Sequence, residues 1–227
     1  MIKVAAFDLD DTLYDEIDYC RSGFAAVAES LASSPGKPSA KNIFDALWDE
    51  FTPGNHTRTF NAALEALGID YDDNLIRNMV QVYRNHSPKI TLPLESQAIL
   101  SELSDKYTLV LLTDGFLPAQ KLKVQALGIG KYFQTIVYTE ELGREFWKPS
   151  PAGFHKLMVS LHCDAESMAY VADDEEKDFL APNKLGMVSI QIVRPTGLHT
   201  KSSNLPTYAA RYKIEGLRQL PTLLGQL

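Results

Sequence analysis

The chain has 227 residues, a length that fits one large domain or two modest ones. Hydrophobic residues make up 45% of it and charged residues 22%, a balance typical of folded globular proteins and unlike that of disordered chains. The formal net charge is −7 and no cluster of lysines and arginines occurs, which argues against nucleic acid as the main partner.

The amino terminus indicates the start of a folded core. Residues 2–7 form an apolar run that ends at Asp8, and this run is too short for a signal peptide or a membrane span. We therefore expect a cytoplasmic protein with no membrane partner. Cys20 and Cys163 are far apart and belong to no Cys-x-x-Cys or Cys/His cluster, so we expect neither a disulfide nor a zinc site.

Short apolar runs alternate with helical patterns through most of the chain. The runs predict buried strands at 2–7, 107–112, 135–138, 168–172 and 188–193. The helical patterns lie at about 95–105, 118–127, 151–161 and 175–185. Repeated alternation of strand and helix predicts an α/β fold, in which helices cover both faces of a parallel sheet. Ligands of such sheets bind beyond the carboxyl ends of the strands.

The segment 15–89 interrupts this alternation. It shows no convincing strand, but apolar residues recur at helical spacing, with patterns at about 55–67 and 72–85 among them. We predict an all-helical domain of about four helices at 15–89, inserted into a core made of 1–14 and 90–227.

The first group of candidate site residues is Asp8-x-Asp10-x-Thr12, directly after the first strand. Two carboxylates at this spacing point into one crevice, where they can hold a divalent cation and divide nucleophilic and acid–base roles. The triplet alone also fits a solvated turn that caps a helix.

The second strand ends in Thr113-Asp114-Gly115, where a hydroxyl and the N–H groups of a turn can bind phosphate oxygens. Lys148 stands between Trp147 and Pro149, and its compact charge suits a phosphoryl oxygen or an attacking carboxylate. Taken singly, a turn or a surface lysine explains each of these features.

The fourth strand runs into the acidic segment 173–178, which begins with Asp173 and Asp174 and ends with Asp178. So many carboxylates repel one another unless they are solvated, cap a helix or bind a cation. All of these features fall at strand ends or just beyond them, so we expect them to share one crevice.

In this order the motifs resemble those of the haloacid dehalogenase superfamily, in the branch whose helical cap lies between the first and second motifs. The likeness rests on residues 7–13, 113–115, 148–149 and 170–179 and covers nearly the whole chain. It implies a Rossmann-like core, the segment 15–89 as the cap, and a phosphatase. The sequence departs from the family at Ala172, where a glycine is usual.

The resemblance also implies roles. Asp8 is the expected nucleophile, which forms an aspartyl phosphate, and Asp10 the general acid and then base. Mg²⁺ is expected on the carboxylates of Asp8 and Asp173 and on the backbone carbonyl of Asp10. The remaining expected residues bind the phosphoryl group (Thr113, Asp114 and Lys148) or support the site (Thr12, Asp174 and Asp178).

The expected substrate is a small phosphorylated metabolite: a sugar phosphate, an acylated amino-sugar acid phosphate or a nucleotide. Asp10 favours phosphoryl transfer over dehalogenation, because dehalogenases of the family lack the second aspartate. Two alternatives stay open, a phosphomutase of the same family and a non-enzymatic phospho-accepting or regulatory protein. The sequence predicts neither the individual substrate nor the oligomeric state.

Overall fold

The computed structural model describes residues 1–52, 57–194, 197–198, 203 and 205–227. The chain forms two compact units. One consists of Met1–Glu16 with Thr91–Leu227, and the other of Ile17–Ile90. Among the described helices, none combines the length and the apolar content that a bilayer crossing requires.

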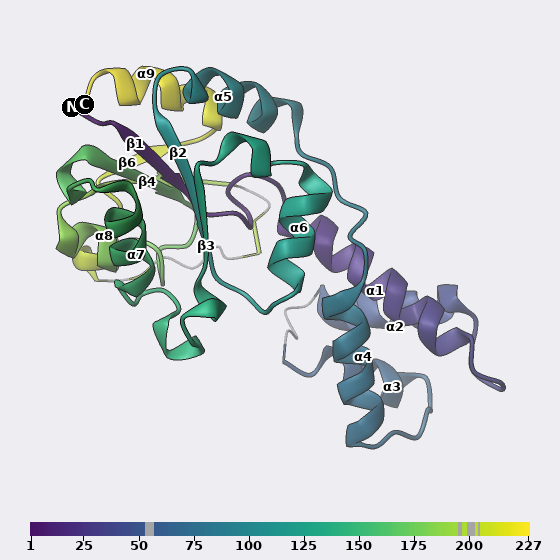
Figure 1. Cartoon of the computed structure of the whole chain (residues 1–227). Helices are drawn as coiled ribbons and strands as arrows, with labels where there is room; N and C mark the ends of the chain where they lie inside the picture. The colour runs from purple at the N-terminus through teal and green to yellow at the C-terminus, as the bar shows by residue number, and fades with distance from the viewer. Residues whose placement is uncertain (53–56, 195–196, 199–202, 204) are drawn as a thin grey trace. The chain divides into compact units, whose positions relative to one another are not determined.

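A parallel sheet of six strands organises the first unit (Figure 1), in the order β3-β2-β1-β4-β5-β6. The central strand β1 pairs with β2 on one side and with β4 on the other. The strands are β1 (Val4–Phe7), β2 (Thr108–Thr113), β3 (Thr135–Tyr138), β4 (Met168–Ala172), β5 (Val188–Ile192) and β6 (Tyr212–Ile214). The chain therefore reverses its winding direction at β1. The carboxyl end of β1 lies at the crevice where such sheets bind ligands.

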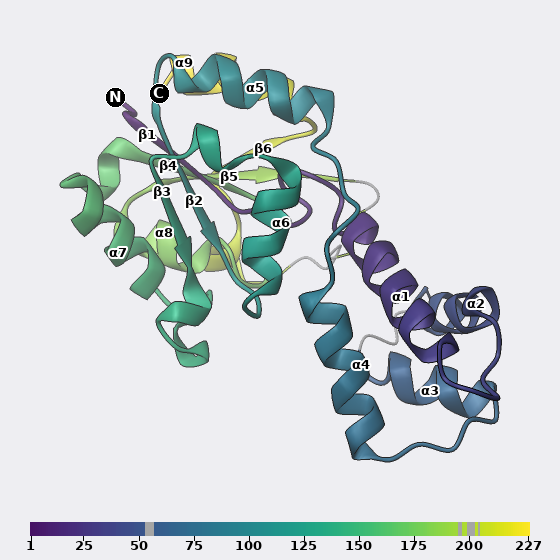
Figure 2. The same cartoon turned by 45° about the vertical axis from the view of Figure 1, so that its right-hand side comes forward.

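Helices cover both faces of this sheet (Figure 2). Helices α7 (Ala152–Leu161) and α8 (Leu180–Leu185) lie on one face, while α5 (Leu94–Ser104) and α9 (Leu220–Gly225) lie together on the other. On the α7 and α8 face, Phe154 is fully buried in a cluster with alternate strand residues such as Ala6, Leu112 and Tyr170. Strands buried on both sides explain why the sequence shows continuous apolar runs. The α/β fold is confirmed.

Two parts of the first unit differ from the expectation. The helix expected at 175–185 begins only at Leu180, because residues 174–178 form a turn in which the Asp178 carboxylate accepts a hydrogen bond from the Asp174 N–H group. The strand β6 and the helix α9 were not predicted. Each is short, and an element of three to six residues is too short to show a clear period.

The second unit is helical. It contains α2 (Ala40–Phe51), α3 (Thr59–Ala66), α4 (Asp73–Asn85) and most of α1 (Glu16–Ala32). The ring centroid of Phe24 in α1 lies 5.1 to 6.4 Å from those of Trp48, Phe51, Phe60 and Tyr83. The aromatic residues of the unit therefore form its core. Residues 55 and 56 of the expected helix at 55–67 lie outside the described residues.

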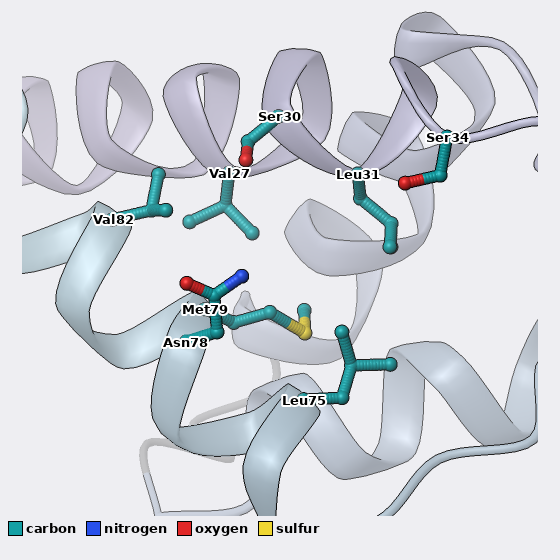
Figure 3. Close-up of a pocket in the computed structure, with 8 residues that line it drawn as sticks. All are labelled: Val27, Ser30, Leu31, Ser34, Leu75, Asn78, Met79 and Val82. Atoms are coloured by element: carbon teal, nitrogen blue, oxygen red, sulfur yellow. The ribbon is translucent and has the colours of Figure 1, made fainter.

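A small cavity of about 60 Å³ lies between α1 and α4 (Figure 3). Val27 and Leu31 of α1 face Leu75 and Met79 of α4 across it. Ser30, Ser34 and Asn78 share its lining with the apolar side chains, so the cavity lies where the apolar faces of two amphipathic helices give way to their polar faces.

Candidate active site

Asp8 stands at the carboxyl end of β1. Its N–H group donates to the carbonyl of Val171 in β4 at 2.9 Å, and the residue is only 2% exposed. The chain then turns tightly, because the N–H groups of Thr12 and Leu13 both donate to the carbonyl of Leu9. The turn places Asp8 and the residues after it beyond the edge of the sheet.

The turn depends on an unusual backbone conformation at Asp11, whose φ is +52°. Aspartate adopts this left-handed conformation more readily than most residues do. Its carboxylate also accepts hydrogen bonds from the N–H groups of Glu16, at 2.8 Å, and Leu198, at 2.7 Å. Asp11 therefore ties the turn to the start of α1 and to the segment after β5.

The end of β4 contributes the second set of carboxylates. Asp173 accepts a hydrogen bond of 3.2 Å from the hydroxyl of Thr12, and the turn after it returns Asp178 to the same place. One carboxylate oxygen from each of Asp8, Asp173 and Asp178 lies within 4.8 Å of the other two. Carboxylates from two neighbouring strands thus form one buried cluster.

Lys148 lies against this cluster. Its Nζ atom is 2.8 Å from Oδ1 of Asp8, 2.7 Å from Oδ1 of Asp178 and 3.0 Å from the hydroxyl of Tyr170. The Tyr170 hydroxyl donates in turn to Asp178 at 3.1 Å. A buried ammonium group is tolerated only where such partners compensate for lost hydration. The fold therefore holds Lys148 in contact with the proposed nucleophile.

Burial and mutual repulsion shift the ionisation of these groups. Burial raises the pKa of Asp8 to about 7, against the opposing attraction of Lys148. Burial also raises the pKa of Asp173 to about 8, and the charges of Asp178 and Asp8 add to this effect. Burial alone would lower the pKa of Lys148, but the charges of Asp178 and Asp8 outweigh it and raise that pKa well above its usual value.

The cluster fits a hard divalent cation. It offers three carboxylates, which are the oxygen donors that such cations prefer, and all three are buried. Burial raises the pKa values of Asp8 and Asp173, and the charge of Asp178 adds to both shifts, so the site disfavours their ionised forms in the absence of a cation. A bound cation would favour those ionised forms, so Asp8, Asp173 and Asp178 are the side chains that could hold one.

The end of β2 supplies Thr113 and Asp114. The Thr113 hydroxyl is buried and accepts a hydrogen bond of 2.7 Å from the Gln120 side chain. The Asp114 carboxylate accepts bonds from the Thr139 hydroxyl at 2.6 Å and from the backbone N–H of Lys148 at 3.0 Å. Asp114 was expected to bind phosphate, but its carboxylate holds the Lys148 loop in place, so only its backbone stays available for the expected role.

Asp10 lies apart from the carboxylate cluster. Its side chain contacts residues on α6 (Ala119–Leu127) instead: Gln120 at 2.8 Å, and Lys123 at 2.8 and 2.9 Å. It also accepts a bond of 2.5 Å from the Tyr14 hydroxyl. Gln120 and Lys123 are not among the residues that the sequence motifs predict for the site. Two polar residues at a spacing of three on the buried face of an amphipathic helix are a signal that could have revealed them.

Arg194, just beyond β5, is likewise not among the predicted site residues. Its guanidinium donates to the carbonyl of Thr12 at 2.7 Å and to the carboxylate of Asp15 at 2.8 Å. The Nε atom is buried and has no hydrogen-bond partner among the described residues. No sequence motif marks this arginine, because its contacts are with the turn after β1. It therefore holds that turn through the Thr12 carbonyl and the Asp15 carboxylate.

The expected site residues therefore meet at the carboxyl edges of β1, β2 and β4. Asp8, Thr12, Lys148, Asp173 and Asp178 are joined by direct contacts. Asp10 and Thr113 are linked to each other through Gln120, and Asp174 is linked to the cluster through its hydrogen bond with Asp178.

The haloacid dehalogenase-like hydrolase family model matches residues 5–192 of this chain. A solved structure, that of a 2-haloacid dehalogenase from Pseudomonas syringae pv. Tomato DC3000, aligns over 100% of this chain and 99% of its own, with 26% identity and a TM-score of 0.69. The chain belongs to the haloacid dehalogenase-like hydrolase family.

Two curated relatives are similar to this chain over most of their length. The glyceraldehyde 3-phosphate phosphatase of Methanopyrus kandleri is 30% identical over 203 residues, which cover 86% of this chain and 85% of the relative. The human N-acylneuraminate-9-phosphatase is 26% identical and aligns over 100% of this chain and 95% of its own. Both are phosphatases of small phosphorylated metabolites by name.

Proposed function

We propose that this protein is a Mg²⁺-dependent phosphomonoesterase that hydrolyses a small phosphorylated metabolite through an aspartyl phosphate on Asp8. The chain is a phosphatase, as its relatives are, and the metal and the covalent route are the proposal. One observation carries it: Asp8 and Lys148 are in contact beside two further carboxylates, at the end of the sheet where ligands bind.

The proposed reaction has two steps. A carboxylate oxygen of Asp8 attacks phosphorus, and the bond from phosphorus to the leaving oxygen breaks while the proton of Asp10 passes to that oxygen. The Asp10 carboxylate then takes a proton from water, whose oxygen attacks phosphorus. The bond from phosphorus to Asp8 breaks, inorganic phosphate leaves, and both aspartates return to their starting state.

Charge neutralisation is the main requirement of the first step, because a carboxylate and a phosphate dianion repel each other. We assign Lys148 and the hydroxyl of Thr113 to the phosphoryl oxygens. Mg²⁺ would be held by the carboxylates of Asp8 and Asp173 and the backbone carbonyl of Asp10, with Asp178 as a supporting group. When bound, it would reduce the repulsion between the nucleophile and the phosphate.

We infer the substrate class from the relatives. Glyceraldehyde 3-phosphate and N-acylneuraminate 9-phosphate, which two of them act on by name, are both small hydroxylated phosphomonoesters. We therefore expect a sugar phosphate or an acylated amino-sugar acid phosphate, ahead of a nucleotide. We propose that the helical unit, Ile17–Ile90, is the cap that selects among them.

The 2-haloacid dehalogenase of Pseudomonas syringae is similar in structure and sequence, so halide release is the second reaction to test. Halide departs without a proton, so a dehalogenase has no use for a second carboxylic acid. Here Asp10 is held in place by hydrogen bonds from three side chains, those of Gln120, Lys123 and Tyr14. Such fixing is expected of a residue that takes part in the reaction. We therefore favour the phosphatase.

The test is a panel of phosphorylated metabolites assayed for phosphate release, with Mg²⁺ and with EDTA. A parallel assay of 2-chloropropionate follows chloride release. We expect Mg²⁺-dependent phosphate release by the native protein and none by Asp8→Asn, which lacks the charged attacking oxygen.

Asp105→Asn is the matched control, since Asp105 is exposed and stands just before the amino end of β2, whereas the site lies at the carboxyl end of that strand. It should keep full activity. Phosphate release by Asp8→Asn at the native rate would refute the nucleophile, and chloride release without phosphate release would favour the dehalogenase. Conversion of a substrate to an isomer without phosphate release would indicate a mutase.

A further inference from the structure

Helix α6 carries two polar residues on its buried face. Gln120 is 2% exposed and Lys123 is 4% exposed, and they lie beside the apolar Ala119, Val124 and Leu127. Lysine is rarely buried to this degree unless it is paired. The two residues therefore need a partner that outweighs the cost of burying them.

The nearest partner of both is Asp10, and the carboxylate of Glu16 lies 3.6 Å from Nζ of Lys123. Nζ of Lys123 reaches both carboxylate oxygens of Asp10, at 2.8 and 2.9 Å, and Nε2 of Gln120 reaches Oδ2 at 2.8 Å. The Tyr14 hydroxyl donates a hydrogen bond of 2.5 Å to Oδ1 of Asp10. A carboxylate held through both oxygens cannot turn freely about its side-chain bonds. The position of Asp10 is thus set by a helix that begins more than a hundred residues later in the chain.

Gln120 connects this carboxylate to a second part of the site. The same Nε2 atom lies 2.7 Å from the Thr113 hydroxyl and 2.8 Å from the carbonyl of Asp114. An amide nitrogen carries two hydrogens, so it can bond at most two of these three acceptors at once. A small movement of Asp10 away from Gln120 would therefore leave both hydrogens to the end of β2.

We propose that Lys123 and Gln120 are positioning residues for Asp10, which hold its carboxyl group for proton transfer and tie it to Thr113. When Asp10 carries the proton that it gives, one of the groups that donate to its oxygens must accept instead. The Tyr14 hydroxyl can do so, because a hydroxyl both donates and accepts. The inference rests on the proposed function, because it assigns Asp10 to protonation of the leaving oxygen. It adds to that function a pair of residues on α6 that do not touch the phosphoryl group but decide where the proton donor lies. Proton transfer requires such placement within hydrogen-bond reach.

A merely structural ion pair is the competing explanation. A buried ion pair can contribute to folding alone, and its loss would then lower activity equally for every substrate. A positioning role instead predicts a loss that depends on the leaving group. The departure of 4-nitrophenolate needs little help from an acid, whereas the departure of phenolate needs more, and the two aryl phosphates are nearly the same shape.

The experiment measures kcat/KM for 4-nitrophenyl phosphate and phenyl phosphate with Mg²⁺. This ratio includes only the steps up to release of the phenol, so it isolates the protonation from the later hydrolysis of the aspartyl phosphate. We expect Lys123→Met to lower kcat/KM for phenyl phosphate about tenfold more than for 4-nitrophenyl phosphate. Lys123→Arg, which keeps the charge, should restore most of the difference.

Three further variants complete the test. Lys121→Met changes a lysine on the exposed face of the same helix, paired with Glu141 at 2.8 Å, and should leave both ratios unchanged. In an Asp10→Asn background, Lys123→Met should have no further effect on the selectivity between the two esters. Gln120→Met should also lower kcat/KM more for phenyl phosphate than for 4-nitrophenyl phosphate, but by a smaller factor than Lys123→Met does. It serves as the test if Lys123→Met does not fold.

An equal loss for both esters, or an undiminished effect of Lys123→Met without the Asp10 carboxylate, would overturn the positioning role. Failure of the proposed function has a different signature. In that case Asp8→Asn would still hydrolyse 4-nitrophenyl phosphate, and the positioning role, which rests on that function, would be overturned with it.

Discussion

Nζ of Lys148 lies 2.8 Å from Oδ1 of Asp8, and neither side chain is more than 3% exposed. In this contact a buried ammonium group faces a carboxylate whose pKa burial has raised to about 7. The pair is therefore both a structural element and the centre of the proposed chemistry, so changes at either residue should affect folding and activity together.

The first prediction concerns Lys148→Met, which keeps the volume of the side chain and removes its charge. Asp8 and Asp178 would lose their shared partner, and breaking a buried ion pair in this way costs about 3 to 5 kcal/mol of folding free energy. We expect that loss in urea unfolding with EDTA present, together with loss of phosphatase activity.

Lys156→Met provides the control, because Lys156 lies on α7 with 44% of its side chain exposed. It should alter neither the unfolding midpoint nor the activity. If Lys148→Met has the same urea midpoint of unfolding as the native protein, the buried pair does not stabilise the fold as argued.

The second prediction concerns Asp173→Asn. Burial raises the pKa of Asp173 to about 8, and the charges of Asp178 and Asp8 add to this effect, so above about pH 8 the substitution removes an unfavourable negative charge and should stabilise the metal-free protein. The same change removes a donor for the cation. Thermal unfolding above that pH should thus show a higher melting temperature in EDTA and a smaller increase on adding Mg²⁺.

Glu176→Gln removes a charge at an exposed position of the same acidic segment and should show neither effect. An increase with Mg²⁺ as large in Asp173→Asn as in the native protein would exclude Asp173 as a metal ligand.

The third prediction concerns pH. The pKa values of Asp8 and Asp173 are raised from 3.8 to about 7 and about 8, so the folded protein holds protons that the unfolded chain releases. Their contribution to stability is fully present below about pH 4 and is lost as the pH rises through 7 to 8. The lowered pKa of Asp178 acts in the opposite direction, but only in the acid range.

The metal-free protein should therefore lose stability between pH 5 and pH 8.5, and a variant carrying both Asp8→Asn and Asp173→Asn should lose much less. Saturating Mg²⁺ should flatten the dependence in the native protein. Urea unfolding at a series of pH values measures this, and equal slopes for the native protein and the double variant would contradict the prediction.

The fourth prediction concerns Arg194→Met. The change removes the hydrogen bond to the Thr12 carbonyl and the ion pair with Asp15, which fix the turn after β1. Loss of a buried hydrogen bond from a charged donor costs about 1 to 3 kcal/mol, and looser placement of the turn should lower kcat more than it raises KM. Arg211→Met, on an exposed arginine of the same unit, is the control and should retain native kinetics. Native kinetics in Arg194→Met as well would mean that the turn does not depend on this arginine.

The strands and the positions of several site residues can be predicted from local sequence patterns. The runs that became β1, β2 and β4 are continuous and apolar because each strand is covered on both faces, so their positions could be predicted from the sequence. The acidic and polar residues after these strands could be placed at one edge, because parallel strands end on the same side of a sheet. The segment 174–178 has a helical pattern but forms a turn, because the carboxylates of Asp178 and Asp174 accept hydrogen bonds from the N–H groups of Asp174 and Glu176, and local propensity does not describe such bonds.

The sequence by itself determined the α/β fold, the family and the strand ends where Asp8, Thr113 and Asp173 stand, since each depends on neighbouring residues and on a repeating period. Only the tertiary structure decided that Lys148 touches Asp8 and Asp178, that Asp114 holds the Lys148 loop, and that Lys123 and Gln120 hold Asp10. These contacts join residues far apart in the chain. They arise from how helices and loops pack on the sheet, and a packing arrangement leaves no periodic signal in the residues that it brings together.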